Sequence, residues 1–551
     1  MEQSFLALIE KAIKDYWDLD ALTDYNGATL QYKDVARKIE KIHILFEHIG
    51  LKKGEKVALC GRNSSHWGVA FLATLSYGAV AVPILHEFKA DNVHHIVNHS
   101  GARFLFVGDR VWENLNEQMM PNLDGIILLT DFSIIMSRNE GLNYSREHLN
   151  EIFGQKFPKN FRKEHVSFHH DQPEELALIN YTSGTTSSSK GVMLPYRSLW
   201  SNMAFAMEKL PFLHVGDRIV SILPMAHMFG MSFEFLFEFC VGCHIFFLTR
   251  TPSPKVISQA FCDVKPTLVV TVPLVVEKVI KKNVLPKLEK LSMKMLLKLP
   301  VISAKVKEQI CHKIIEGFGG EMKEMIIGGA PLNKDIERLL NSISFPYTVG
   351  YGMTECGPII SYEDWHTFKM FSCGRAVPRM EVCIDSSDPA NIAGEIICRG
   401  TNVMLGYYKN HEATAQTIDK DGWLHTGDLA TMDSAGHITI RGRSKNMLLG
   451  TNGQNIYPEE IEGQLNNMQY VSESIIIQQG EKLVALVYPD FDEAFANGLD
   501  EKGVAAAIEH NRQQLNANLP GYSQIARVKI YNEEFEKTPK KSIKRYLYQN
   551  A

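Results

Sequence analysis

The 551-residue chain lacks the features that mark several large classes of protein. Its nine cysteines follow no disulfide framework, which is typical of a reducing compartment. It contains no run of about 18 uncharged apolar residues, and its first residues lack the basic region of a signal peptide. A net charge of −5 argues against a general nucleic-acid binder. These absences predict a cytoplasmic protein without a membrane-spanning helix.

Cysteine spacing also gives little support for a structural metal site. Cys240 and Cys243 form one C-x2-C pair, and no second pair lies at zinc-site spacing. Both belong to an apolar run over 239–248. We therefore expect these two thiols to pack in the core.

The apolar pattern predicts an α/β fold with two domains. Short apolar runs alternate with helical patterns between residues 56 and 107, which is typical of parallel sheets covered by helices. From about Met380 short strands and turns follow each other, which predicts a small β-rich subdomain. A boundary is expected near 442–445, because the last hundred or so residues have their own α+β pattern. The predicted division is a large N-terminal domain, 1–442, and a small C-terminal domain, 443–551.

Residues 181–191 read Tyr-Thr-Ser-Gly-Thr-Thr-Ser-Ser-Ser-Lys-Gly and directly follow a strand-like apolar run. Backbone N–H groups, hydroxyls and a lysine can converge on a polyphosphate in such a loop, although the Walker spacing is absent. Taken alone, the segment could equally be a flexible surface loop. The candidate phosphate-binding residues are Thr182, Ser183, Gly184, Thr185, Thr186 and Lys190.

Four further motifs follow in order. They are Gly-Tyr-Gly-Met-Thr-Glu at 350–355, Trp-Leu-His-Thr-Gly-Asp-Leu at 423–429, Arg-Gly-Arg-Ser-Lys-Asn at 441–446 and Asn-Gly-Gln-Asn-Ile-Tyr-Pro-Glu-Glu-Ile-Glu at 452–462. In this order and spacing the five motifs resemble the acyl-adenylate-forming (AMP-binding) enzymes. That family includes acyl-CoA synthetases, luciferases and peptide-synthetase adenylation domains. The resemblance covers nearly the whole chain, from about Leu22 onward.

The resemblance implies a two-step reaction that uses ATP, Mg²⁺ and CoA. A carboxylate oxygen attacks the α-phosphate of ATP, pyrophosphate leaves, and the acyl-AMP then passes its acyl group to a thiol. Thr185 and Glu355 would bind Mg²⁺, which prefers oxygen ligands beside phosphate. The ordinary alternative for Glu355 is a helix N-terminal carboxylate.

The same resemblance assigns the nucleotide contacts. Tyr351 would offer a flat face to the adenine, while Gly350 and Gly352 allow close approach of the backbone. Asp428 would accept the ribose hydroxyls, although it could instead stabilise a turn after Gly427. The other expected contacts are Thr354 on the α-phosphate, Arg443 on phosphate or ribose, Gly329, Ala330 and Pro331 on the adenine side, Lys445 as the hinge between the domains, and Gly453.

His227 lies in the segment Pro-Met-Ala-His-Met-Phe-Gly at 224–230, which resembles the part of the family that contacts the substrate carboxylate. A lone histidine near aromatic residues is usually a core histidine. Its place between the phosphate loop and the Thr-Glu motif favours the functional role. The residues 231–237 that follow are apolar enough to line an acyl tunnel, and could equally be plain core.

The chain departs from the family pattern in two places. Ser187 and Ser189 stand where the phosphate loop usually has Gly and Pro. In the C-terminal motif at 538–545, Ser542 stands where the family places its adenylation lysine. We predict that Lys541, or failing that Lys544, takes over this role.

The acid and the acceptor are suggested by finer resemblances. Residues 452–458 and 403–408 look most like those of long-chain fatty acyl-CoA synthetases, which implies a medium-to-long-chain fatty acid and CoA as substrates. The segment 277–313 carries ten Lys against three Glu among apolar residues and could rest on anionic lipid at the inner face of a membrane. It could also be a solvated helix pair. Two other classes stay open: a ligase that loads a carrier protein, and a non-catalytic acyl-nucleotide binder.

Overall fold

The computed structural model describes residues 3–182, 189–249, 253–284, 300–450, 454–480, 482–538 and 543–549. Its largest sheet has eight strands in the order β20-β9-β8-β4-β3-β5-β6-β7. The strands are β3 (Lys56–Cys60), β4 (Val80–Ile84), β5 (Ala102–Val107), β6 (Gly125–Leu128), β7 (Ile134–Ser137), β8 (Leu176–Thr182), β9 (Lys190–Pro195) and β20 (Gly406–Tyr407). The five strands from β8 to β6 are parallel, and antiparallel strands form the edges.

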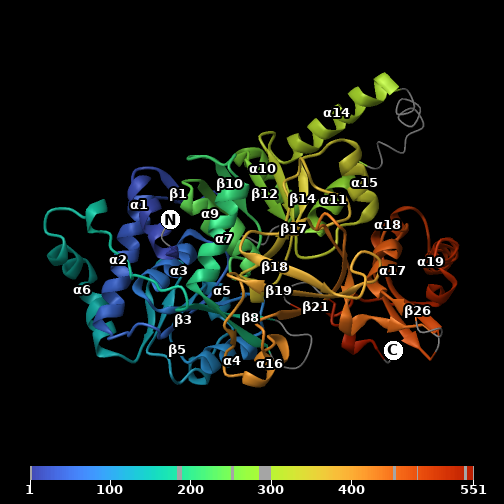
Figure 1. The fold of residues 1–551 in the computed structure, drawn as a ribbon. Helices are drawn as coiled ribbons and strands as arrows, with labels where there is room; N and C mark the ends of the chain where they lie inside the picture. Colours follow the sequence, from blue (N-terminus) through green and yellow to red (C-terminus); the bar gives the residue numbers. More distant parts are fainter. Residues whose placement is uncertain are drawn as a thin grey trace.

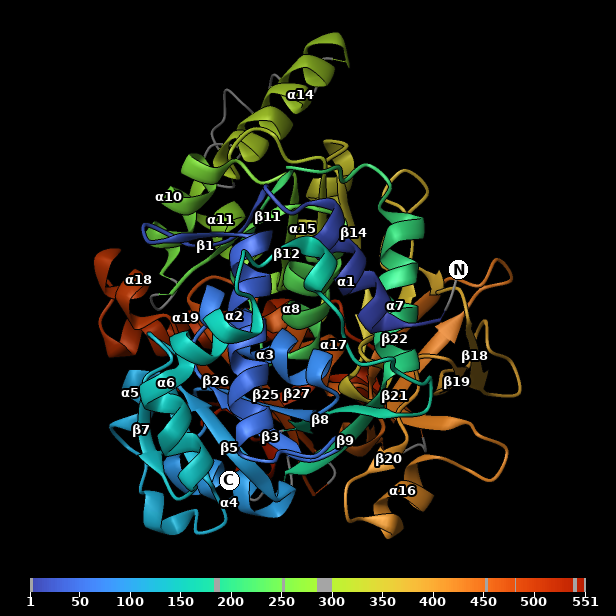
Figure 2. The same cartoon turned by 90° about the vertical axis from the view of Figure 1, so that its left-hand side faces the viewer.

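Helices connect and cover the strands of this sheet (Figures 1 and 2). They are α1 (Phe5–Asp15), α2 (Tyr32–His48), α3 (Ser65–Tyr77), α4 (Ala90–Ser100), α6 (Glu140–Lys156) and α7 (Tyr196–Lys209). Local signals set their ends: the Ser64 hydroxyl accepts a hydrogen bond from Trp67 N at the start of α3, and Gly78 ends that helix at φ 88°. The strand–helix alternation predicted for 56–107 is confirmed.

Two smaller sheets stand beside the large one. The first has the order β10-β11-β1-β2, and the second, β12-β13-β14, is parallel throughout. Their strands are β1 (Asp20–Asp24), β2 (Thr29–Gln31), β10 (Arg218–Ser221), β11 (His244–Phe247), β12 (Leu268–Thr271), β13 (Glu324–Ile327) and β14 (Tyr347–Val349). Helices α10 (Pro254–Val264), α11 (Pro273–Asn283), α14 (Pro300–Gly317) and α15 (Lys334–Ser342) surround the second sheet. The end of α14 projects from the body of the molecule (Figure 1).

The predicted β-rich subdomain is confirmed. It consists of two antiparallel sheets, β15-β16-β17 and β18-β19-β21-β22. The strands are β15 (Tyr351–Gly352), β16 (Ile359–Tyr362), β17 (Arg375–Ala376), β18 (Met380–Asp385), β19 (Gly394–Gly400), β21 (Leu424–Met432) and β22 (Ile438–Arg443).

The C-terminal domain has its own core. Its sheet is β25-β26-β27, made of β25 (Val471–Gln479), β26 (Lys482–Pro489) and β27 (Ile525–Ile530), with α17 (Pro458–Leu465), α18 (Phe491–Ala496) and α19 (Glu501–Asn516) packed around it. The two hydrophobic clusters of this domain draw only on residues from Leu448 to Tyr548, whereas the three clusters of the large domain end by Ile440. The α/β fold with a separate small domain is therefore confirmed, and the division at 442/443 stays a prediction.

The structure also bears on the expected lack of a membrane-spanning helix and on the expected core packing of Cys240 and Cys243. No helix within them is long and apolar enough to cross a bilayer. Cys240 and Cys243 are buried free thiols within the large hydrophobic cluster, as the apolar run around them predicted.

Candidate active site

A cleft of about 3250 Å³ separates the large domain from the C-terminal domain. Residues from every described motif line it, together with Glu459, Glu462, Lys537 and Arg545 from the small domain. The predicted residues that line it are Thr182, Lys190, His227, Gly329, Ala330, Pro331, Gly350, Tyr351, Gly352, Thr354, Glu355, Arg443 and Lys445. Segments that are distant in the sequence thus meet at one site.

Tyr351, Asp428 and Arg443 form one hydrogen-bonded group beside the cleft, in which Asp428 is buried behind the exposed Arg443 and does not itself line the cleft. Asp428 on β21 and Arg443 on β22 are cross-strand partners, with Arg443 Nε 2.8 Å from Asp428 Oδ1. The Tyr351 hydroxyl donates to Asp428 Oδ2 at 2.7 Å. Burial raises the pKa of Asp428, and the charge of Arg443 opposes that rise. Both carboxylate oxygens are therefore engaged, and the ring of Tyr351 and the guanidinium of Arg443 face the cleft.

Glu355 lies in a 3-10 turn, η4 (Thr354–Cys356), and lines the cleft together with Thr182 and Lys190. Its Oε1 accepts a hydrogen bond from the Tyr407 hydroxyl at 2.8 Å, and Lys190 Nζ stands 4.7 Å from the centre of the Tyr407 ring. Tyr407 thus connects the metal-binding candidate to the predicted phosphate-binding lysine. Tyr407 is not among the site residues predicted from the sequence. Its position in the Gly-Tyr-Tyr sequence at 406–408, which resembles the same family, could have indicated it.

The two ends of the predicted phosphate loop are held together by the β8–β9 hairpin. Thr182 and Lys190 are cross-strand partners, and Gly191 is required because a Cβ there would stand 2.8 Å from the Ile179 side chain. Ser183, Gly184, Thr185 and Thr186 lie outside the described residues. Within the described ranges no group of three or more His, Cys, Asp or Glu could hold a metal ion. The carboxylate of Glu355 suits Mg²⁺, which takes few protein ligands when phosphate oxygens complete its shell.

The residues predicted to form the adenine-side wall lie where the parallel strands β13 and β14 end. Gly350 N donates to Ile327 O at 2.9 Å, which places the two glycine-containing turns side by side. A Cβ at Gly352 would lie 2.2 Å from Pro358 O, so this position accepts only glycine. A Cβ at Gly328 would lie 2.9 Å from the ring of Phe229. The wall is therefore closely packed against the segment that carries His227.

His227 stands between β10 and the short helix α8 (Met228–Met231), and its ring nitrogen accepts from Phe229 N at 3.3 Å. Beyond it, aromatic rings follow one another along the cleft. Ring centres are 6.2 Å apart for Phe229 and Phe233, 6.2 Å for Phe233 and Phe205, and 5.4 Å for Phe205 and Tyr362. All four line the cleft.

Residues 231–237 divide between the cleft and the core, and the acyl tunnel stays a prediction. Phe233 lines the cleft, whereas Phe235 and Phe237 are fully buried in the core. The segment forms a π-helix, η3 (Ser232–Leu236), followed by α9 (Phe237–Cys240).

On the C-terminal side of the cleft, the structure does not bring Lys544 to the site. Its ammonium group pairs with Glu536, and it does not line the cleft. Its neighbour Arg545 does, paired with buried Glu462, whose pKa burial raises to about 7 although Arg545 opposes the rise. Lys537 also lines the cleft, 2.6 Å from Glu473. Lys541, Ser542 and Gly453 lie outside the described residues.

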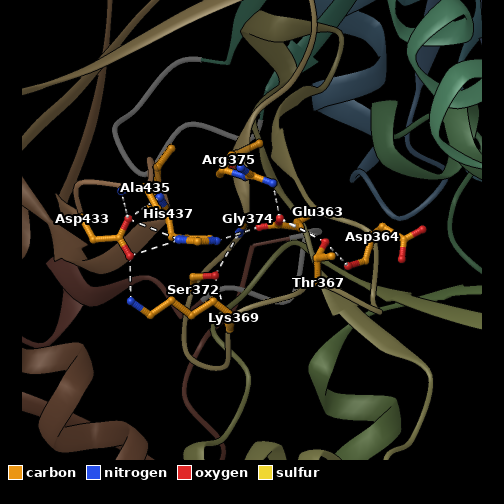
Figure 3. Close-up of polar contacts among 12 residues, drawn as sticks. Glu363, Asp364, Thr367, Lys369, Ser372, Gly374, Arg375, Asp433, Ala435 and His437 are labelled. Carbon is orange, nitrogen blue, oxygen red and sulfur yellow. Dashed lines mark hydrogen bonds and ion pairs between the residues drawn. The ribbon is translucent and has the colours of Figure 1, made fainter.

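A polar network braces the strands that carry Asp428 and Arg443 (Figure 3). Glu363, which follows β16, binds Arg375 Nη2 at 2.6 Å and His437 Nε2 at 3.0 Å. His437 also contacts Asp433 at 3.1 Å, and Lys369 Nζ stands 2.7 Å from the same carboxylate. The hydrogen bond from Lys369 lowers the pKa of Asp433. The network joins β16, which pairs with the Tyr351 strand, to the β21–β22 turn.

Comparisons with known proteins agree with this geometry. The AMP-binding enzyme family matches residues 9–408, and the AMP-binding enzyme C-terminal domain matches residues 445–550. The long-chain-fatty-acid–CoA ligase ACSBG2 of Rattus norvegicus is 27% identical over 513 residues, covering 87% of this chain and 76% of that protein. A long-chain-fatty-acid–CoA ligase of Escherichia coli O157:H7 is 26% identical over 487 residues, covering 84% and 80%.

Solved structures share the fold at lower identity. ATP-bound MatB from Rhodopseudomonas palustris superposes with a TM-score of 0.76 at 21% identity, covering 100% of this chain and 99% of that one. The anthranilate CoA ligase AuaEII in complex with anthranoyl-AMP gives a TM-score of 0.77 at 18% identity, covering 99% and 96%. The likeness establishes the fold and leaves the acid open.

Proposed function

Because the chain belongs to the AMP-binding enzyme family, we propose that its substrate is a medium-to-long-chain fatty acid. The family chemistry is adenylate formation followed by acid–thiol ligation, with ATP, Mg²⁺ and CoA. The proposal concerns which acid enters that chemistry and which residues of this chain serve it.

The aromatic arm of the cleft carries the proposal. Phe229, Phe233, Phe205 and Tyr362 extend it away from His227, and Leu210 and Ile326 also line it. Such a surface stabilises apolar carbon by removing it from water and provides no paired charge for a second carboxylate. A flexible acyl chain fits it better than a short polar acid. The names of the relatives at 26–27% identity point the same way.

The residues around the reacting atoms would act mainly by position and charge. Bound Mg²⁺ would neutralise phosphate charge, with Glu355 and Thr185 as its protein ligands. Lys190 and Arg443 would add positive charge at the phosphates, and His227 would hold the acid carboxylate beside the α-phosphate. Placing two anions in contact is the main barrier, and fixed positive groups lower it.

We also propose that the small domain rotates about Lys445 between the two half-reactions, with Arg443 staying on the large-domain side, where it pairs with Asp428. The two steps need different groups at one α-phosphate, and family members meet this need by moving a domain. The separate hydrophobic cores on either side of Lys445 support this proposal.

A fatty-acid chain-length series with CoA as acceptor tests the function. Pyrophosphate exchange should require ATP, Mg²⁺ and a fatty acid, and acyl-CoA should form without any added protein. Exchange without CoA consumption would indicate a carrier-loading ligase. Binding of fatty acid and ATP without exchange would indicate a non-catalytic binder. A preference for malonate or benzoate over every fatty acid would overturn the substrate assignment.

Contact with a membrane is a further part of the proposal. Of the basic segment 277–313, α11 and α14 are described, residues 285–299 lie outside the described ranges, and α14 projects from the body (Figure 1). Sedimentation with vesicles rich in phosphatidylserine should carry down more protein than neutral vesicles, and 0.5–1 M salt, roughly, should abolish the difference. Equal sedimentation with both lipids would contradict the contact.

A further inference from the structure

The loop that carries His227 is held by three buried polar side chains that the family chemistry does not use. The loop spans 222–227, between β10 and α8, and four of its residues, Ile222, Leu223, Pro224 and His227, line the cleft. Its peptide groups would need partners because they lie beneath the protein surface. Those partners come from three elements that are far apart in the sequence.

Glu234, on the π-helix η3, is the first partner. It is fully buried, and its Oε2 accepts from Leu223 N at 2.8 Å and from the Ser221 hydroxyl at 3.2 Å. A π-turn within a helix is often found at a functional site. Burial raises the pKa of Glu234 well above its usual value, which favours the neutral carboxylic acid.

Asn63, which follows β3, is the second. Its Nδ2 donates to Leu223 O at 2.6 Å and to the Ser221 hydroxyl at 3.1 Å, and its Oδ1 accepts from Met225 N at 2.9 Å. The side-chain amide of Asn63 thus donates to one backbone carbonyl of the loop and accepts from one backbone N–H. Its side chain can adopt no other set of partners without releasing a buried group.

Asn180, on β8, is the third and connects two parts of the cleft. Its Nδ2 donates to Ala226 O at 2.8 Å, next to His227. Side chains two residues apart on a strand share a face, so Asn180 lies on the same face as Thr182, which begins the phosphate loop. The carbonyl beside His227 and the start of the phosphate loop are therefore fixed by one strand.

We propose that Asn63, Asn180 and Glu234 are positioning residues for His227, which they hold at the acyl end of the cleft and in register with the phosphate loop. The proposal rests on the proposed function of His227 as the group that contacts the acid. None of the three is catalytic, because they act on the loop backbone. Losing one should displace His227, and a displacement of about 1 Å can cost roughly a hundredfold in rate.

The chain supplies a matched control for Glu234. Glu238 stands four residues later and is equally buried, and neither of its carboxyl oxygens has a hydrogen-bond partner among the described residues. Glu234→Met and Glu238→Met therefore remove the same buried group, and only the first removes a bond to the loop. Glu234→Gln keeps a neutral oxygen acceptor for Leu223 N and should rescue the loss.

Two measurements on the purified full-length chain test the inference. In pyrophosphate exchange, Glu234→Met and Asn180→Leu should lower kcat/KM for the acid by about ten- to a hundredfold. Glu234→Gln should stay within about threefold of wild type. For Glu234→Met the KM for ATP should stay within about twofold, because Glu234 touches only the acid-side loop, whereas Asn180→Leu should raise the KM of both substrates.

Hydrogen exchange followed by mass spectrometry gives the second readout and needs no activity. The Leu223 and Met225 amides should exchange about tenfold faster in Glu234→Met and unchanged in Glu238→Met and Glu234→Gln. The inference would be overturned if the loop amides kept their protection against exchange in Glu234→Met and Asn180→Leu. It would also be overturned if Glu238→Met lost as much of this protection as Glu234→Met. If wild type makes no adenylate with any acid, the proposed function fails, while hydrogen exchange still decides whether Glu234 and Asn180 hold the loop. If Glu234→Met does not fold, Asn180→Leu decides by the same readout.

Discussion

The two walls of the cleft differ in how their charged groups are paired. On the large-domain wall, Asp428 binds Tyr351 and Arg443 across neighbouring strands, and Glu355 binds Tyr407 from another sheet. On the small-domain wall, Lys537 pairs with Glu473. Arg545 likewise pairs with Glu462 of the same domain. The charged groups of the first wall take their partners from several elements of the large domain, whereas those of the second wall take them from the small domain itself.

This difference indicates which wall can move. Within the part of the chain that the structure describes, two polar contacts join the large domain to the residues beyond Lys445: Arg441 Nη1 lies 3.3 Å from Glu460 Oε1, and Lys281 Nζ donates to Asn466 O at 3.3 Å. Exposed pairs of this kind contribute about 0–1 kcal/mol each. Rotation of the small domain would break little, while any displacement on the large-domain wall would disturb buried hydrogen bonds. Each prediction below tests one side of this comparison.

The largest effect is expected at Glu355, on the fixed wall. Glu355→Gln keeps the shape and the bond from Tyr407 but removes the charge that would bind Mg²⁺. Turnover should fall by about two to three orders of magnitude, the usual scale for one preorganised charge. Steady-state acyl-CoA formation over a range of Mg²⁺ measures it. Tyr407→Phe serves as the control, since it removes one hydrogen bond and leaves the carboxylate. Near-normal turnover in Glu355→Gln would contradict the metal assignment.

The second largest effect on activity is expected in the C-terminal motif at 538–545, where Ser542 stands in place of the expected lysine. Lys541→Ala should reduce pyrophosphate exchange by about ten- to a hundredfold, because a positive charge beside the carboxylate and α-phosphate lowers the barrier. Lys544→Ala should change it less, since Lys544 is paired with Glu536 away from the cleft. The thioester step from supplied acyl-AMP should be nearly unaffected in both. If both variants, and Lys540→Ala as well, leave exchange intact, no tail lysine serves adenylation.

A substitution at the proposed hinge residue, Lys445, should have a smaller effect, and it should slow one half-reaction more than the other. Lys445 lies in the 3-10 turn η5 (Ser444–Asn446), and proline there fixes φ. Lys445→Pro should separate the two half-reaction rates by about tenfold, with one step slowed and the other retained. Lys445→Ala, which removes the side chain and leaves φ free, should not separate them. Equal loss in both steps for Lys445→Pro would indicate a contact role or unfolding in place of a hinge.

The sequence predicted the first wall well and the supporting layer behind it poorly. Thr182, Tyr351, Glu355 and Arg443 were found because each belongs to a contiguous motif, and the strand–helix alternation brought those motifs to one cleft. The position of the Lys544 side chain depended on Glu536, eight residues away on the other side of a bridge between Lys537 and Ile543, which no motif encodes.

Buried polar pairs formed across the sequence could not be foreseen. Asn63 and Leu223 are 160 residues apart, and an asparagine after a strand is in sequence an ordinary turn residue. Glu234 interrupts an apolar run, which is a usable signal, because a charge in such a run is rarely buried without a partner; Glu324, which follows Lys323, has no such signal. The partner itself is set by tertiary contacts.

Glu324 provides the last prediction, which concerns the stability of the fixed wall. It is fully buried on β13 and accepts a 2.7 Å hydrogen bond from Tyr362, a residue of the aromatic arm. Burial raises its pKa from 4.5 to about 7. An acid with a raised pKa binds more protons in the folded than in the unfolded state, so wild type should lose stability as pH rises from about 4.5 to about 7 and then level off.

Glu324→Gln cannot ionise, so its Tm should exceed that of wild type by a few degrees at pH 8, roughly 1 to 2 kcal/mol, and match it near pH 5. Thermal unfolding at both pH values measures this, with Tyr362→Phe as a variant that loses the hydrogen bond and keeps the ionisable group. Because Glu324 does not line the cleft, Glu324→Gln should change turnover less than about twofold at pH 7. A variant less stable than wild type at pH 8 would show that Glu324 is held as a charged partner of Tyr362.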